Sequence, residues 1–325
     1  MKGFDDRFAD LPDYILQCTA MIWEGRDIAA LDWHYADDLI VRTPDGINRG
    51  NGAGKANTMA TLSEFPDRQL LGEDVIWCGD AEVGFLSSHR ILSTATHRGG
   101  AFGPGGGRQL VFRTIADTFC RENRVRDEWL IRDNAAIAVQ LGRTAREAAR
   151  DAILSGDTAM PLTPETDIAG PYAEMGNDDE WGRCHADLLN RVMSADFPAI
   201  PAQYDRACHL FTPGGRDVHG WDGAMDFWLQ LRSALPSADF RIEHRIGRTD
   251  PLLSPRSAIR WSLTGLHEGW GRFGRPTGAR VHVMGVSHAE FGPRGLRRET
   301  TLFDEIAIWK QILLQTEYAD ERADS

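Results

Sequence analysis

The sequence repeats itself at a constant spacing, and this repeat limits the folds open to it more than any other feature. Placing the segment that begins at Arg124 beside the one that begins at Gly295 gives an offset of 171 residues (295 − 124). Identical residues then coincide, namely Glu128 with Glu299, Asp133 with Asp304 and Gln140 with Gln311. Two copies at so long a period indicate a tandem domain duplication, because the repeats of solenoid proteins are much shorter. The chain therefore has to build one structure twice.

The length of 325 residues agrees with two domains. We expect the first domain at residues 1–150 and the second at residues 178–325. Residues 151–177 between them contain several prolines and glycines and show little hydrophobic periodicity. They are expected to form a linker.

Both copies carry the same order of local patterns. Apolar residues at helical spacing fill residues 10–38 and 51–65 in the first copy, and residues 178–205 and 221–235 in the second. Four strand-like runs follow in each copy: 73–79, 82–97, 108–122 and 124–133, and then 240–247, 257–268, 279–291 and 297–309. Helices followed by strands, without alternation, are typical of an α+β fold with an antiparallel sheet.

A glycine-rich segment, residues 96–112, has the composition of a phosphate-binding loop. A phosphate loop needs a helix directly after it, since the free N–H groups of the helix N-terminus hold the anion. Here a strand-like run follows instead. We therefore expect a wide hairpin turn in which glycine supplies positive φ.

Composition excludes several classes of function. A net charge of −12 argues against nucleic acid and anionic membranes as partners, which require a basic footprint. No apolar run approaches the roughly 20 residues of a membrane-spanning helix. Five cysteines without a CxxC pair suit a reducing compartment, and the acidic N-terminal segment does not look like a signal peptide. We expect a cytoplasmic protein without a metal site.

The pattern as a whole resembles the SnoaL-like polyketide cyclases, which belong to the nuclear transport factor two-like superfamily. The resemblance rests on residues 65–80, the "THRGGAFG" hairpin at 96–103, "EWLIRD" at 128–133 and the ending "QLG" at 140–142. It implies two tandem cone-shaped domains, each a curved antiparallel sheet wrapped around N-terminal helices and enclosing a deep apolar pocket. The second copy departs from the pattern, because Thr300 replaces Trp129 and the "QLG" ending is lost.

The resemblance also implies a chemistry. The family's cyclases close a ring by an intramolecular aldol reaction, with an aspartate as acid and base and without a cofactor. That aspartate lies near the end of the domain, where this sequence has Asp133 and Asp304. We take Asp133 and Asp304 as candidate catalytic residues, together with the hairpin histidines His97 and His267.

Strand alternation adds candidates for ligand contact. Trp129 and Asp133 share one strand face, and Thr300 and Asp304 share its equivalent. The four candidate ligand-binding residues are His89, Trp129, Trp261 and Thr300. Asp133 is expected at the floor of the apolar pocket, near His89 or His97, with a raised pKa. A buried, unpartnered carboxylate is costly, so Asp133→Asn is expected to be neutral or stabilising.

Two classes of function remain open. The first is a cofactor-independent cyclase, isomerase or hydrolase that acts on a small apolar carbonyl compound. The second is a non-catalytic binding or carrier protein with tandem pockets. In both, the partner is a small hydrophobic molecule, and the halves pair through their sheets as the subunits of a dimer would. Whether the whole chain forms a homodimer, which half is functional and which substrate it takes are left open by the sequence.

Overall fold

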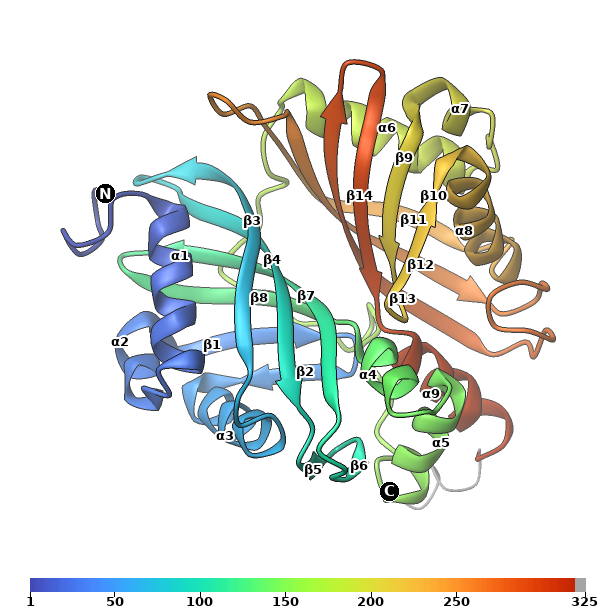
Figure 1. Cartoon of the computed structure of the whole chain (residues 1–325), viewed down its shortest axis with the longest axis horizontal. Helices are drawn as coiled ribbons and strands as arrows, with labels where there is room; N and C mark the ends of the chain where they lie inside the picture. Colours follow the sequence, from blue (N-terminus) through green and yellow to red (C-terminus); the bar gives the residue numbers. More distant parts are fainter. Residues whose placement is uncertain (319–325) are drawn as a thin grey trace.

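The computed structural model of the chain describes residues 1–318 and has two similar α+β halves (Figure 1). Each half contains a six-stranded sheet with helices packed on it. The expected α+β fold with two curved sheets is therefore confirmed. The first half contains α1 to α4 and the second contains α6 to α9, while α5 packs against α9.

The first sheet has the strand order β2-β1-β8-β7-β4-β3. Its strands are β1 (Tyr35–Thr43), β2 (Gly46–Arg49), β3 (Gln69–Asp80), β4 (Gly84–Thr96), β7 (Gln109–Arg121) and β8 (Arg124–Arg132). The helices are α1 (Leu11–Thr19), α2 (Leu31–His34), α3 (Gly50–Glu64), α4 (Asn134–Gln140) and α5 (Ala145–Leu154), and two short helical turns are η1 (Ala20–Glu24) and η2 (Ile28–Ala30).

The second sheet repeats this arrangement with the order β10-β9-β14-β13-β12-β11. Its strands are β9 (Tyr204–Thr212), β10 (Arg216–His219), β11 (Asp239–Arg248), β12 (Arg256–Leu266), β13 (Arg280–Gly292) and β14 (Gly295–Phe303). Its helices are α6 (Glu180–Met193), α7 (Ala199–Gln203), α8 (Gly220–Ala234) and α9 (Glu305–Thr316). The last strands β8 and β14 occupy equivalent places, and Asp133 and Asp304 follow them directly.

The sheets differ from the expected four antiparallel strands in one respect. Each has two further strands, β1 and β2 or β9 and β10, and β1 and β9 run parallel to β8 and β14. The expected first helix extended to residue 38, but the chain enters β1 at Tyr35. Irregular burial along β1, with Asp37 and Asp38 exposed, hides the alternation that identifies a strand.

The glycine-rich segment forms the connection between two strands, as expected. It links β4 to β7 and contains a small hairpin of β5 (Gly99–Gly100) and β6 (Gly103–Pro104). His97 anchors its base, because its N–H donates to the Arg108 carbonyl and its carbonyl accepts from Gly107. Gly99, Gly103 and Gly107 have positive φ, which fits glycine.

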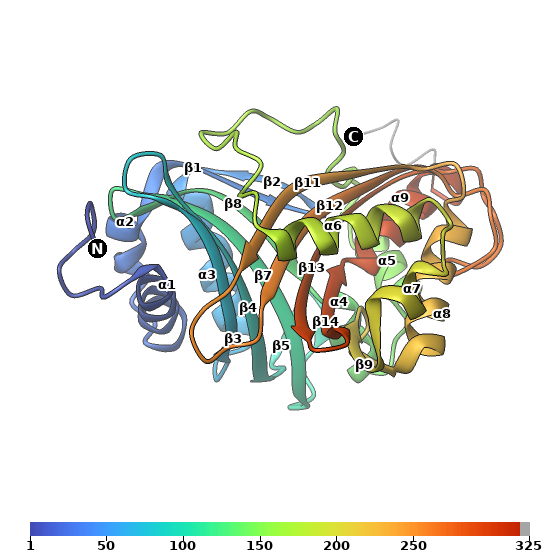
Figure 2. The same ribbon diagram turned by 90° about the horizontal axis from the view of Figure 1, so that it is seen from above.

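The two sheets pack face to face, with α1 and α3 on one outer side and α6 and α8 on the other (Figure 2). Apolar side chains from both sheets meet between them, namely Ile76, Leu86, Ile115, Phe119, Ile131, Ile246, Met284, Val286 and Leu302. Polar contacts cross the same interface: Ser88 Oγ lies 2.7 Å from His288 Nε2, and Arg260 donates to Asp117 at 2.7 Å. The halves therefore pair within one chain through their sheets.

This packing explains why the central strands are buried on both faces. In β4, residues 84–91 are buried without interruption, although the run contains serines, a histidine and an arginine. Ser88 and Arg90 point to the second sheet, whereas His89 and Ile91 point to the interior of the first domain. Alternation along β4 therefore separates an interface face from an interior face.

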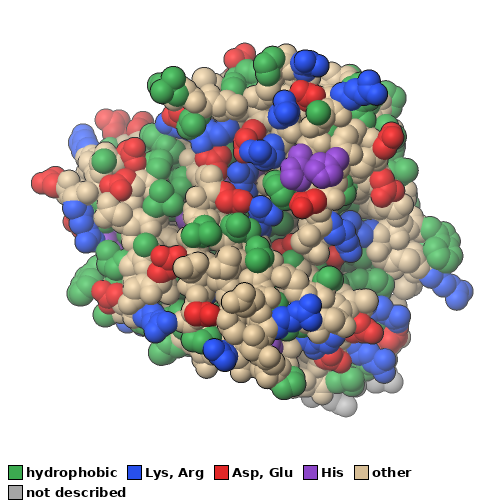
Figure 3. Space-filling model, in the orientation of Figure 1, with side chains coloured by type: hydrophobic (Ala, Val, Ile, Leu, Met, Phe, Trp, Pro, Cys, Tyr) green, Lys and Arg blue, Asp and Glu red, His purple; other side chains and the backbone are tan. Residues whose placement is uncertain are grey.

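On the face of the molecule seen in Figure 3, Lys and Arg side chains are interspersed with Asp and Glu. Among residues 1–318, no helix has the length and apolar composition needed to cross a membrane.

Candidate functional site

The first domain contains a partly open cavity of about 200 Å³ between its helices and the concave face of its sheet. Most of the wall is apolar and aromatic: Tyr14, Ile15, Trp23, Leu31, Tyr35, Leu39, Val41, Ile91, Val125 and Leu130. Asparagine and threonine side chains of α3 add polar groups, and four ionisable side chains complete the wall: Arg68, His89, Glu128 and Arg132. A mostly apolar cavity with a few polar groups is the usual form of a small-molecule site.

Strand β8 supplies two of the ionisable side chains. Glu128, Leu130 and Arg132 point into the cavity. Because successive side chains of a strand alternate, Asp127, Trp129 and Ile131 point to the other sheet.

The Glu128 carboxyl is 8% exposed and has no hydrogen-bond partner among residues 1–318. Burial raises its pKa to about 7, and the nearby charge of Asp127 adds to the rise. A carboxyl that titrates near neutral pH can accept a proton in its ionised form and return it afterwards.

His89 faces the same cavity from β4 and is 2% exposed. Burial lowers its pKa to about 4, so the imidazole is neutral at physiological pH. Its Nε2 atom has no hydrogen-bond partner among residues 1–318 and is shielded from solvent beside Gly72. A neutral imidazole in an apolar wall can donate a hydrogen bond to a carbonyl oxygen of a ligand.

Asp133 does not lie on the floor of this cavity, and that part of the expectation is wrong. It caps α4 by accepting the N–H of Ala136 at 3.0 Å. It also accepts the N–H groups of Gly214 at 2.8 Å and Gly215 at 3.0 Å, which belong to a turn of the second domain. Burial raises its pKa to about 6, and these three hydrogen bonds oppose the rise.

Trp129 also lies outside the cavity, contrary to the expected strand face. The guanidinium groups of Arg42 and of Arg260 from the second domain lie over its ring, with their Cζ atoms 4.7 and 3.8 Å from the ring centroid. The alternation itself is as expected, since Asp127, Trp129 and Ile131 share one face of β8, but that face points to the second sheet and not into the cavity.

His97 is buried at the base of the glycine-rich connection and contacts Glu64 Oε1 through Nε2 at 3.1 Å. It does not line the cavity. Of the four candidates in the first copy, the cavity is lined by His89 alone.

The candidates of the second copy lie apart from one another. Asp304 caps α9 and accepts from Asn134 of the first domain, and burial raises its pKa to about 7. His267 contacts Thr277 Oγ1 at 3.0 Å, and Thr300 is fully buried on β14. Trp261 donates to Ser287 Oγ at 3.0 Å inside the core.

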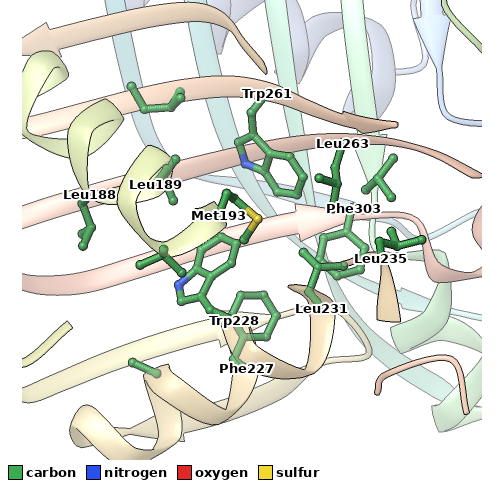
Figure 4. Packing of buried hydrophobic residues seen from close by; sticks show 14 of the residues in the cluster. Leu188, Leu189, Met193, Phe227, Trp228, Leu231, Leu235, Trp261, Leu263 and Phe303 are labelled. Carbon is green, nitrogen blue, oxygen red and sulfur yellow. The ribbon is translucent and has the colours of Figure 1, made fainter. Parts of the chain in front are cut away.

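The interior of the second domain is filled by large side chains (Figure 4). Trp228 on α8 stands where α3 has Thr58, and Trp261 on β12 stands where β4 has Ile91. Phe303 takes the place of Arg132 at the end of the last strand. These three rings pack against one another in the region that corresponds to the cavity.

The ionisable set of the cavity is also largely missing from the second domain. Ile259 occupies the position of His89, and Ala238 occupies that of Arg68. Glu299 corresponds to Glu128, but it accepts hydrogen bonds from Tyr204 and Thr301. The second copy therefore keeps the carboxylate and satisfies it internally.

A cone of sheet and helices around a buried cavity defines a class of small-molecule-binding α+β domains. The SnoaL-like polyketide cyclase family matches residues 14–141, and a SnoaL-like domain family matches residues 186–296. The chain thus belongs to the SnoaL-like proteins and contains two such domains in tandem. A search of curated proteins found no match.

Solved structures with detectable similarity each cover one part of the chain. IdmH, a putative polyketide cyclase from Streptomyces antibioticus, is 22% identical, covers 41% of this chain and 99% of its own, and has a TM-score of 0.37. A putative SnoaL-like polyketide cyclase from a Jannaschia species is 14% identical over 42% of this chain and 96% of its own, with a TM-score of 0.35. TsrD from Streptomyces laurentii is 20% identical, covers 39% of this chain and 92% of its own, and has a TM-score of 0.35.

Sequence reasoning missed Glu128, Arg68 and Arg132 as cavity residues. A signal for Glu128 was present, because the repeat aligns it with Glu299. Arg68 follows the second helical region of the first copy, and the second copy has Ala238 at the equivalent position, so the repeat gives no indication of it.

Proposed function

We propose that the first domain is a cofactor-independent acid/base catalyst, a cyclase, isomerase or hydrolase, that acts on a small apolar carbonyl compound. Glu128 is its general base and His89 its hydrogen-bond donor to the substrate carbonyl. The observation that carries the proposal is the buried Glu128 carboxyl, which faces an apolar cavity without a protein partner and titrates near pH 7.

The proposed reaction begins when the ionised Glu128 removes a proton from a carbon next to the substrate carbonyl. The electron pair of the broken C–H bond moves into an enolate, whose oxygen accepts a hydrogen bond from His89. In a cyclisation, the enolate carbon attacks a second carbonyl of the same molecule and forms a C–C bond. The resulting alkoxide takes the proton back from Glu128, which restores the carboxylate. In an isomerisation, the proton returns to a different carbon.

The acid/base role passes from the expected aspartate to Glu128 for a geometric reason. A general base has to come within hydrogen-bond reach of the proton that it removes. The oxygens of Asp133 accept three backbone N–H groups and face the other domain, so they are committed to structure. Glu128 has no such partner and faces the cavity.

We further propose that the second domain is a scaffold for the first. Its interior is occupied by Trp228, Trp261 and Phe303, and its sheet covers the outer face of the first sheet.

The proposal is tested by proton exchange. Tetralone and benzoylacetone are incubated with the protein in deuterated water, and loss of the proton next to the carbonyl is followed by NMR. We expect wild type to accelerate the exchange and Glu128→Gln to slow it by about 10²–10⁴-fold, the usual contribution of a general base. Glu122→Gln, which changes an exposed carboxylate paired with Arg126, serves as the matched control and should exchange like wild type.

If Glu128→Gln exchanges the ketone proton at the wild-type rate, Glu128 is not the general base. Binding of these ketones without any acceleration of exchange would favour a carrier, the second class that the sequence left open.

A further inference from the structure

Arg68 and Arg132 both line the first-domain cavity, and Arg132 also lines a neighbouring cavity with Asn134 and Asp304. Arg68 follows α3, and its Nε and Nη2 atoms donate to Ser93 Oγ at 3.0 and 2.9 Å. Its guanidinium also lies over the ring of Phe112 at 5.3 Å. Arg132, the last residue of β8, donates from Nε to Asn134 Oδ1 at 2.8 Å.

Neither arginine forms an ion pair with a carboxylate of residues 1–318, although most arginines of the described chain do. Burial lowers the pKa of Arg132, and the charges of the Asp304, Glu64 and Asp45 carboxylates, at longer range, raise it. The pKa of Arg68 is lowered to about 9 by burial and, in addition, by the charge of Arg132, so the two cations are close enough to repel each other. Two like charges this close repel each other, and an anion bound between them would relieve the repulsion.

The remaining N–H groups of both side chains have no acceptor among the described residues. A guanidinium presents its N–H groups as a planar fork, which matches the two oxygens of a carboxylate. The second domain has Ala238 and Phe303 at these positions, so the pair of cations occurs only in the half that has the cavity.

The strand register places the cations at one end of the cavity and Glu128 at the other. Arg132 is opposite Thr114, which in turn is opposite Ile91, and Ser93 is the next inward-facing residue on β4. Glu128 is opposite Thr118, and lies about 13 Å along β8 from Arg132. The pKa of Glu128 is set by burial and Asp127, with no contribution from either arginine, as this separation requires.

We infer that Arg68 and Arg132 form an anion subsite, and that the cavity takes an elongated apolar acid whose carboxylate is held by both guanidinium groups. The inference deepens the proposed function, since it places the reacting carbon of such a substrate at the opposite end, beside Glu128 and His89. The carboxylate removes the repulsion between the two cations and leaves the apolar body of the molecule against the aromatic wall.

The subsite is tested by comparing two ligands with the same ring system, naphthoate and acetonaphthone, which differ in the charged group. Binding is measured by calorimetry at pH 6, where Glu128 carries its proton. We expect wild type to bind the acid at least about tenfold more tightly than the ketone. Arg68→Met and Arg132→Met should each reduce this ratio towards one, whereas Arg121→Met, at an exposed position outside the cavity, should keep it.

The ratio separates loss of the subsite from a general loosening of the cavity, which would weaken both ligands equally. Equal affinity for the two ligands in wild type, an unchanged ratio in both cavity variants, or failure of both ligands to bind would overturn the inference. Equal competition by acetate would reduce the site to one for simple anions and would also overturn it.

The same measurement distinguishes the subsite from the proposed reaction. An acid preference without any proton exchange would leave the subsite standing and overturn the proposed catalysis. Proton exchange without a preference for the acid would overturn the subsite and leave the proposed catalysis standing.

Discussion

At the scale of single residues, burial of the Glu128 carboxyl links stability to pH. Its pKa is about 7 in the folded chain, against 4.5 for an unperturbed glutamate. The folded state therefore holds this proton more tightly than the unfolded state does, so the free energy of unfolding falls as pH rises from about 4.5 to about 7. A neutral amide in place of the carboxyl does not titrate, so the free energy of unfolding no longer falls over this pH range on its account.

We expect Glu128→Gln to have the stability of wild type near pH 4.5 and to be more stable by about 3 kcal/mol above pH 7. Urea denaturation across this pH range measures the difference, with Glu122→Gln as the control that should follow wild type. A constant difference at all pH values would mean that Glu128 does not titrate near neutrality.

The sequence predicts individual residues less well than it predicts elements, and β8 shows why. The position of this strand was clear, yet the side chains chosen from it, Trp129 and Asp133, lie outside the cavity. Alternation correctly groups Asp127, Trp129 and Ile131 on one face, but it does not say which face points into the domain, because that depends on the second sheet. On β4 the assumed alternation agrees with the structure, and His89 lies in the cavity wall.

At the scale of elements, the junction between β8 and α4 depends on Asp133. Its two oxygens accept the N–H groups of Ala136, Gly214 and Gly215, which join a helix start to a turn of the other domain. An asparagine can keep two of these bonds, but its amide nitrogen cannot accept the third. These contacts oppose the expectation that Asp133→Asn is neutral or stabilising, whereas the raised pKa of Asp133 agrees with it, and a stability measurement decides between them.

We expect Asp133→Asn to lower the free energy of unfolding by about 1–3 kcal/mol near pH 4, the cost of leaving a buried donor unsatisfied. The deficit should shrink towards pH 8, because burial raises the pKa of Asp133 to about 6 and the ionised wild type loses stability there. Chemical denaturation measures it, and Asp37→Asn, at an exposed position of β1, should change stability by less than about 0.5 kcal/mol. Unchanged stability of Asp133→Asn would show that the contact to the turn contributes nothing.

Among the elements, the long central strands and the helices before them could be predicted, because β-branched and aromatic runs and helical spacing are local signals. The parallel strands β1 and β9 could not, since their burial is set by distant partners. The asymmetry between a hollow and a filled half was also outside local reasoning, because a cavity depends on which side chains meet across a domain.

At the scale of the whole molecule, the two halves should unfold as one unit. Asp117 of the first sheet is buried between the sheets and takes hydrogen bonds from Ser88 and from Arg260 of the second. Removing the guanidinium leaves this carboxylate buried without its countercharge. We expect Arg260→Met to destabilise the protein by about 3–5 kcal/mol and both halves to lose structure in a single transition.

Calorimetry measures the number and temperature of the transitions, and Arg206→Met, at an exposed position of the second domain, is the control. If wild type shows two separate transitions and Arg260→Met lowers the midpoint temperature of neither, the two sheets fold independently.

The turns that meet the capping aspartates differ between the halves: Gly214 donates its N–H to Asp133, whereas the equivalent Asp45 faces Lys310. In a dimer of identical subunits, every substitution appears on both sides of the twofold axis at once. A change that filled one cavity would then fill both. Joining the copies in one polypeptide removes that symmetry requirement, so bulky rings can stabilise one half while the other stays hollow. The two domains of one chain can therefore differ from each other as the two subunits of a heterodimer do.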